Sequence, residues 1–401
     1  MTATVLANAL LADGRHADLR IDELGRIAEV GKVAAVAAAG AERIDLGGAL
    51  LVPGMVDGHI HLDKTLLGLK FQSHRPGDTV AERIAREKEI RRELAYPVKQ
   101  RAHRLIRRVV GYGTTFLRSH VDIDGEIGLT GLEALLDVRE SVRDVIGIEL
   151  VAFPQSGIIA DQGTAELLDE AIRAGADLVG GLDPAGIDND IEGHLGVIFA
   201  IAERHGVGCD IHLHDPGDLG CFELRQIAAR AEALGLAGRV AVSHAFALGE
   251  VDDAEFGRTA EALARAGVAI MTNGPGPVAM PPIKRLDAAG VLVFAGSDNI
   301  RDAWSPYGNG DMLERAMLIG YRQGLRADED LELCFDLANG AAASVLGLDD
   351  HDIRPGAAAD LVALPAASIA EAVAVHPPRS LVMKRGRVVA RDGTLTASLR
   401  I

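Results

Sequence analysis

Residues 50–61 of the chain are LLVPGMVDGHIH, an apolar run that ends in two histidines. The apolar part, residues 50–56, is typical of a buried β-strand. A dinucleotide-binding fold would follow its first strand with Gly-x-Gly-x-x-Gly at the start of a helix. Here DGHIH stands in that place, so the sequence argues against such a fold.

Seven more short apolar runs follow and alternate with amphipathic stretches rich in Ala, Leu, Glu and Arg. Eight strands with intervening helices over roughly 300 residues are typical of an α/β fold, the (β/α)8 TIM barrel. The predicted strands are residues 50–56, 114–121, 146–153, 178–182, 207–212, 240–243, 268–272 and 291–296.

The two ends of the chain have a different pattern, in which short alternating runs are separated by glycine-containing turns. This pattern favours antiparallel strands. We predict that residues 1–49 and 350–401 together form a small β-sandwich domain, and that residues 50–349 form a catalytic barrel.

Composition restricts the partners. The chain has 41 basic and 58 acidic residues, a net charge of -17, which disfavours binding to nucleic acid or to an anionic membrane. Three cysteines do not make a disulfide framework, and we find neither a signal peptide nor a membrane-spanning apolar run. We expect a cytoplasmic homo-oligomer that binds a small molecule.

His59 and His61 lie two residues apart at the end of the first strand, so their side chains point to the same face. Two imidazoles on one face can chelate zinc or iron. His212, His244 and Asp298 end the fifth, sixth and eighth strands, at the rim where barrel enzymes place their active sites. Together they predict a metal site with a position open for water.

Several motifs resemble the amidohydrolase superfamily. PGMVDGHIH at residues 53–61 resembles its opening metal motif, and NGAAASVLG at residues 339–347 resembles its closing stretch. FPQSG at residues 153–157, SDN at 297–299 and WSPYG at 304–308 are similar to the cytosine deaminase branch. The resemblance extends over residues 4–395.

The resemblance implies that His59, His61, His212 and Asp298 hold one divalent metal ion, with zinc expected and iron or manganese as alternatives. A bound cation lowers the pKa of water from 15.7 to about 7, so hydroxide can attack the ring carbon that bears the nitrogen. His244 would stabilise the oxyanion, and Asp298 would also carry the proton from the water to the leaving amine.

Other roles follow from the same resemblance. Gln155 and Trp304 would orient and pack the substrate ring, since an amide offers both a donor and an acceptor. Some members bridge two metals with a carboxylated lysine at the end of the fourth strand. Here residues 180–184 are GGLDP, which implies a single metal. Asp183 is then a candidate for substrate contact, or a helix-capping or turn residue.

The fifth strand departs from the cytosine deaminase pattern, in which His-x-x-Glu supplies a proton shuttle. This chain has His214 and Asp215 after His212, and His214 together with Lys64 resembles the isopropylammelide amidohydrolases of s-triazine breakdown. We favour His214 as the shuttle over Asp215, because alternate strand residues share a face. Lys64 would assist through its charge.

The branch's usual Asp-Asp pair is here Asp298-Asn299, which makes Asn299 a further candidate for substrate contact. His120 is expected to support the pocket rather than to bind metal. Residues 81–94 are expected to be an exposed helix face, because Glu and Arg recur at i, i+4 spacing. The remaining histidines are expected to be solvated: His16, His74, His103, His194, His205, His351 and His376.

The leading hypothesis is therefore a metal-dependent hydrolase that removes an amino or alkylamino group from a pyrimidine, a triazine or a related ring. One alternative is hydrolysis of a cyclic amide, against which the missing lysine weighs. A non-catalytic scaffold is the other alternative, and the complete set of expected ligands disfavours it.

Overall fold

The structure is a computed structural model that describes residues 2–33, 40–71, 73–75, 77–94 and 96–396. Eight parallel strands follow one another around a nearly closed barrel, in the order of the chain. They are β6 (Met55–Ile60), β7 (Thr114–Asp122), β8 (Gly147–Phe153), β9 (Leu178–Leu182), β10 (Gly208–Leu213), β11 (Val240–His244), β12 (Val268–Thr272) and β13 (Val293–Ala295). The predicted α/β barrel is confirmed.

The first and last strands meet through a parallel bridge between Ile60 and Asp298. Glycines make this approach possible, because a Cβ at Gly296 would lie 2.4 Å from His59 Cβ, and one at Gly58 would lie 2.4 Å from the Phe294 ring. Side chains at these two positions would therefore hold the strands apart.

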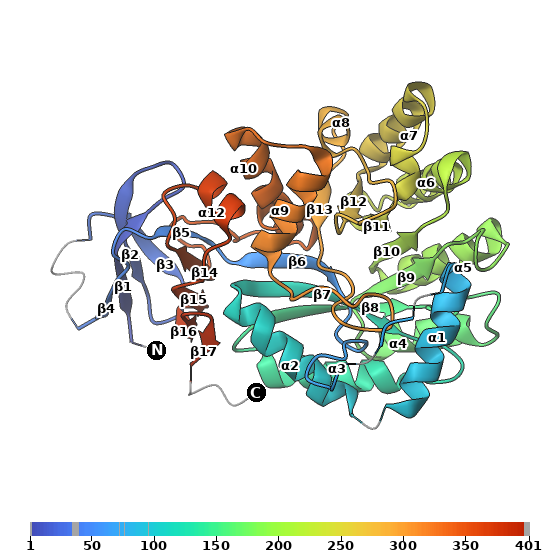
Figure 1. Cartoon of the computed structure of the whole chain (residues 1–401), viewed down its shortest axis with the longest axis horizontal. Helices are drawn as coiled ribbons and strands as arrows, with labels where there is room; N and C mark the ends of the chain where they lie inside the picture. Colours follow the sequence, from blue (N-terminus) through green and yellow to red (C-terminus); the bar gives the residue numbers. More distant parts are fainter. Residues whose placement is uncertain (1, 34–39, 72, 76, 95, 397–401) are drawn as a thin grey trace.

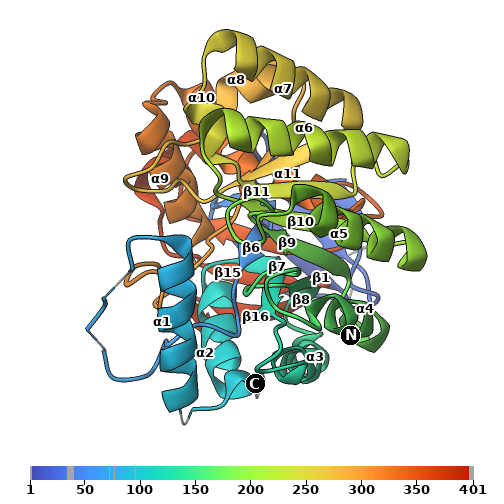
Figure 2. The same cartoon turned by 90° about the vertical axis from the view of Figure 1, so that its right-hand side faces the viewer.

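Helices surround the strands (Figure 2). Those between β6 and β12 are α1 (Val80–Glu93), α2 (Val98–Gly111), α3 (Thr130–Val142), α4 (Thr164–Ala174), α5 (Ile191–His205), α6 (Gly217–Ala233), the short 3-10 helix η1 (Phe246–Gly249) and α7 (Asp253–Ala266). Those that follow are α8 (Ile283–Ala288), α9 (Met312–Gln323), α10 (Asp328–Leu337), α11 (Gly340–Val345) and α12 (Ile369–Val375).

Local sequence sets many helix ends. The side chains of Asp190, Asp252 and Asp311 accept backbone hydrogen bonds at the starts of α5, α7 and α9. A left-handed glycine ends each of the same three helices. None of the helices in the described part of the chain combines the length and the apolar character that a membrane crossing requires.

The chain termini build a separate sheet beside the barrel (Figure 1). Its strands are β1 (Thr4–Leu10), β2 (His16–Ile21), β3 (Ile27–Gly31), β4 (Glu42–Asp45), β5 (Leu50–Pro53), β14 (Leu361–Leu364), β15 (Leu381–Lys384), β16 (Arg387–Arg391) and β17 (Thr394–Leu395). β1 pairs with β4 along one part and with β5 at Leu10, so the nine strands form one branched sheet. A shared core that includes Leu19 of β2 and Met383 of β15 joins its two halves.

One predicted strand differs from the structure. Residues 50–56 were expected to form the first barrel strand, but residues 50–53 pair with β14 in the terminal sheet, and the barrel begins at Met55. Gly54 lies between the two strands, where a Cβ would collide with Thr115. The division into domains 1–49 with 350–401 and 50–349 stays a prediction, and residues 1, 34–39 and 397–401 lie outside its described part.

Candidate active site

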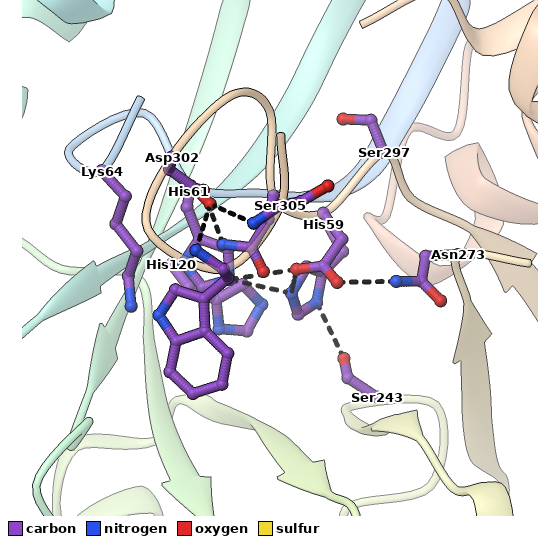
Figure 3. A network of polar contacts seen from close by, with 12 residues as sticks. His59, His61, Lys64, His120, Ser243, Asn273, Ser297, Asp302 and Ser305 are labelled. Carbon is purple, nitrogen blue, oxygen red and sulfur yellow. Dashed lines mark hydrogen bonds and ion pairs between the residues drawn. The ribbon is translucent and has the colours of Figure 1, made fainter. Parts of the chain in front are cut away.

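Polar side chains from four barrel strands, β6, β10, β11 and β13, meet at the carboxyl end of the barrel. Figure 3 shows His59 and His61 of this cluster with their polar neighbours. The ring centroid of His59 lies 5.2 Å from that of His61, 4.6 Å from that of His212 and 5.4 Å from that of His244. Asp298 follows β13 and places Oδ1 3.4 Å from His61 Nε2. The structure therefore brings together all the side chains that the sequence predicted for the metal site.

Donor atoms in this cluster have the spacing of a metal site. Those of His59, His61 and His212 lie within 4.8 Å of one another, and so do those of His59, His244 and Asp298. Both ring nitrogens of His212 are buried without a hydrogen-bond partner. Because buried polar groups need partners, one of the two fits a bound cation. A set of imidazoles with one carboxylate suits zinc or iron.

The electrostatics of the site keep these imidazoles neutral. Burial lowers the pKa of His61 to about 3, and it lowers the pKa values of His212 and His244 well below 6.5. Burial would raise the pKa of Asp298, but hydrogen bonds with His59 and His61 hold it well below 3.8. A neutral imidazole beside an ionised carboxylate is the protonation state in which both bind a metal.

Three site residues have left-handed backbone conformations, which non-glycine residues seldom adopt. The φ angle is 76° at His244, 58° at Asp298 and 37° at Asp183. Each of the three lies at or just after the end of a barrel strand. Strain of this kind gathers at functional sites, where the surrounding structure holds it in place.

The end of β10 carries the two candidates for the proton shuttle. His214 donates its backbone N–H and a ring proton at Nδ1 to the two carboxylate oxygens of Asp183, the latter over 2.9 Å. Its ring stacks on that of His244, with centroids 4.5 Å apart. Asp215 instead accepts the backbone N–H of Gly186 over 2.9 Å and lies beside Glu223 of α6.

Lys64 lies in a second polar cluster, with its Nζ over the rings of Phe153 and Trp304. Its Nζ is 2.9 Å from Asp122 Oδ1 and 3.2 Å from Glu87 Oε2, and it donates a hydrogen bond to Gln155 Oε1. Burial alone would lower the pKa of Lys64, but the charges of Asp122 and Glu87 raise it above 10.5. Trp304 Nε1 donates to the same Glu87 oxygen over 2.5 Å.

Glu87 is therefore a site residue that the sequence did not reveal. Residues 81–94 were expected to be an exposed helix face, yet Glu87 is buried on α1 and links Lys64 to Trp304. Ile84, one turn earlier, packs in a cluster with Phe153 and Leu182. The i, i+4 charge pattern does not distinguish a solvated helix face from one that lies against an active site.

Two more histidines are fully buried, and one of them, His194, differs from its expected setting. His120 is fully buried, with its ring centroid 4.0 Å from that of His59, and neither ring nitrogen has a hydrogen-bond partner. His194, expected to be solvated, is also fully buried and contacts Asp188 through Nδ1 over 2.5 Å.

Asn299, a candidate for substrate contact, donates from Nδ2 to Asp302 over 2.7 Å. Asp302 in turn accepts the backbone N–H of Trp304, so this contact anchors the loop that carries Trp304.

A (β/α)8 barrel with a histidine and aspartate cluster at the carboxyl ends of its strands defines a class of metal-dependent hydrolases. The model of the Amidohydrolase family matches residues 42–390. The chain belongs to this family, whose members are metal-dependent, and the resemblance seen in the sequence is confirmed.

Two relatives of known name are similar to the chain over most of its length. The chain is 34% identical to N-isopropylammelide isopropyl amidohydrolase of Pseudomonas sp. (strain ADP), over 89% of this chain and 90% of the relative. It is 26% identical to pterin deaminase of Rhizobium rhizogenes (strain K84 / ATCC BAA-868), over 87% and 83% of the two chains.

A solved structure similar to the chain is N-isopropylammelide isopropylaminohydrolase from Burkholderia multivorans ATCC 17616, with 41% identity and a TM-score of 0.95 over 99% and 100% of the two chains. Another is 5-methylcytosine deaminase from Klebsiella pneumoniae liganded with 5-fluorocytosine, with 28% identity and a TM-score of 0.85 over 97% of each chain.

Proposed function

We propose that the protein hydrolyses a carbon–nitrogen bond on a small oxo-substituted heterocycle, such as a pyrimidine or a triazine, and releases an amino or alkylamino group. The observation that carries this proposal is the convergence of His59, His61, His212 and Asp298 at the barrel mouth, with buried nitrogens that have no partner. The similarity to an isopropylaminohydrolase and to two deaminases supports the reaction class.

These four side chains would hold one divalent ion, and zinc is the ion we expect. When bound, the ion would supply an acidified water, because a coordinated cation lowers the pKa of water to about 7. No lysine ends β9, so a bridging carboxylated lysine is absent from this position, and the proposal is a mononuclear site.

Asp298 would accept the proton of the attacking water and return it to the leaving amine. Asn273 Nδ2 donates to Asp298 Oδ2 over 2.6 Å and fixes the carboxylate, while Oδ1 faces His59 and His61. His244 would stabilise the oxyanion that forms on the ring carbon. Its Nδ1 is buried without a partner, and the ring is held against that of His214.

His214 is the proton shuttle that the geometry favours. Asp183 binds its Nδ1, which leaves Nε2 to exchange a proton with a ring nitrogen of the substrate. Asp215 is less suited to this role, because it accepts the backbone N–H of Gly186 in the loop after β9. This role for His214 rests on orientation, since a proton-transfer group must reach the proton that it moves.

The polar cluster around Lys64 indicates which ring edge the substrate presents. Gln155 Oε1 accepts a hydrogen bond from Lys64, whereas Gln155 Nε2 is buried without a hydrogen-bond partner. Gln155 therefore offers a donor, and the substrate edge that meets it must carry an acceptor such as a ring carbonyl. Trp304 would pack against the ring face, with its indole fixed by Glu87.

The test is release of ammonia or of an alkylamine from a panel of amino- and alkylamino-substituted oxopyrimidines, oxotriazines and pterins. We expect turnover of at least one oxo-substituted ring, and loss of that turnover after chelation and its return with zinc. If the metal-loaded protein hydrolyses none of these compounds but opens dihydropyrimidine rings, the cyclic amide alternative replaces the proposal.

We further propose that the protein acts in the cytoplasm as a homo-oligomer. All three cysteines are free and buried, which suits a reducing compartment. Leu219 and Phe222 on α6 are 42% and 44% exposed and lie one turn apart, and such apolar side chains are suited to a subunit contact. Light scattering on a size-exclusion column measures the oligomeric state, and a monomer at micromolar concentration would contradict the second part.

A further inference from the structure

A chain of hydrogen bonds runs from His59 into the interior of the barrel. His59 Nδ1 is 2.9 Å from Ser243 Oγ, a contact drawn as a dashed line in Figure 3. Ser243 Oγ donates to Asp210 Oδ1 over 2.9 Å, and Arg118 donates to Asp210 Oδ2 over 2.9 Å. Arg118 also donates to Glu149 over 2.7 Å. The chain crosses strands β6, β11, β10, β7 and β8.

Arg118, at the far end of these hydrogen bonds from His59, fixes which partner donates in each of them. A guanidinium has donors only, so Asp210 accepts from Arg118, and an ionised carboxylate accepts from all its neighbours. The hydroxyl of Ser243 must then give its single proton to Asp210. Its oxygen can only accept from His59, so Nδ1 of His59 carries the ring proton.

This tautomer leaves the lone pair of His59 on Nε2. Nε2 is the atom that faces the candidate metal centre, 3.3 Å from His61 Nε2 and 3.6 Å from Asp298 Oδ1. His59, Ser243 and Asp210 are all fully buried, so water does not compete for these bonds. Hydrogen bonds in such surroundings are stronger than at a surface.

We propose that Ser243, Asp210 and Arg118 are positioning residues that fix the Nδ1–H tautomer of His59 and aim its Nε2 at the metal. The proposal rests on the proposed metal centre but not on the identity of the substrate. Partners of this kind around a ligating histidine typically change metal affinity by 10- to 100-fold.

The same network of hydrogen bonds disfavours a second metal ion in this barrel. His59, His120 and Asp210 also have donor atoms within 4.8 Å of one another. The guanidinium of Arg118, bound to Asp210 over 2.9 Å, places a positive charge beside that group. A second dication there would meet like charge in a buried setting, which is unfavourable.

Ser243→Ala tests the proposal, because it removes one hydroxyl and adds no bulk. We expect its zinc dissociation constant, measured by competition with a chromogenic chelator, to rise 10- to 100-fold. Thr114→Val is the matched control. Thr114 is buried at the amino end of β7, whereas the candidate metal centre lies at the carboxyl ends of the strands, and the hydroxyl of Thr114 has no hydrogen-bond partner. The control should bind zinc within about twofold of the wild type, well below the change expected for a partner of a ligand.

A second measurement reports the tautomer directly. Nitrogen-15 NMR of histidine-labelled, metal-free protein should show Nδ1–H and a free Nε2 for His59, assigned by the signal that His59→Gln removes. In Ser243→Ala the two tautomers should both be populated. Wild-type affinity in Ser243→Ala, or an Nε2–H signal for His59 in the wild type, would overturn the proposal. A wild-type protein that binds no metal would instead overturn the proposed metal centre.

Discussion

The buried carboxylate of Asp183 binds both the backbone N–H and the Nδ1 of the half-buried His214. The pair joins the end of β9 to the end of β10, and Asp183 adopts a φ of 37° to make it. The sequence suggested that Asp183 contacts the substrate or caps a helix. The geometry favours instead a role in holding His214 for proton transfer.

His214→Gln should therefore lower turnover by roughly 10²- to 10⁴-fold, the scale for loss of a general acid–base group. Its zinc content should stay at the wild-type level. Asp215→Asn is the matched comparison on the neighbouring residue and should keep most of the turnover. The measurement is steady-state kinetics on the substrate found in the panel, alongside metal analysis. The opposite ranking of the two variants would assign the shuttle to Asp215.

Removing a ligand should separate metal binding from catalysis. His61→Ala should lose both zinc and activity, because His61 Nε2 points at Asp298 and His59 inside the donor cluster. His244→Ala should retain about one ion per chain and lose turnover by about 10²- to 10³-fold, as expected for one oxyanion-stabilising group. Elemental analysis of the purified variants checks both. An ion-free His244→Ala would make His244 a ligand, and two ions per wild-type chain would contradict the mononuclear site.

Gln155→Ala should raise KM more than it lowers kcat, because its free amide donor meets the substrate before the transition state. The variant also frees Lys64 from one partner, but Asp122 and Glu87 continue to hold the ammonium group. The kcat and KM values for the best substrate in the panel provide the test. A fall in kcat at constant KM would assign Gln155 to the transition state rather than to substrate orientation.

Periodicity was sufficient to predict the barrel, because most of the strands are buried on both faces and contain short apolar runs that alternate with amphipathic helices. The predicted ends of β9 and β12 coincide with those observed. Residues 50–56 were assigned to one strand because both halves are equally apolar. Only the pairing of Leu51 with Ala363, more than 300 residues away, places the first half in the terminal sheet.

The site was predictable where the chemistry is marked by residue type and spacing, as for His59 and His61. The site was not predictable at residues whose burial or contacts depend on packing between distant parts of the sequence. Glu87 lies on a helix with an ordinary surface pattern, and its burial depends on contacts with Lys64 and Trp304. Ser243 and Asp210 carry no motif, and only the register of β10 with β11 brings them together.

The last prediction concerns stability and pH at Glu223, which is fully buried on α6 beside Asp215. Burial, together with the charge of Asp215, raises the pKa of Glu223 from 4.5 to about 9. Between these two pH values the folded protein binds a proton that the unfolded chain releases, so the free energy of unfolding falls as pH rises.

Glutamine is always neutral and can still accept the hydrogen bond from the Ala185 N–H. Glu223→Gln should therefore lose less stability than the wild type between pH 6 and pH 9, measured by urea unfolding of metal-saturated protein. Glu261→Gln on the exposed face of α7 should follow the wild type. Parallel pH dependence in Glu223→Gln and the wild type would show that Glu223 is already ionised in the folded protein near neutral pH.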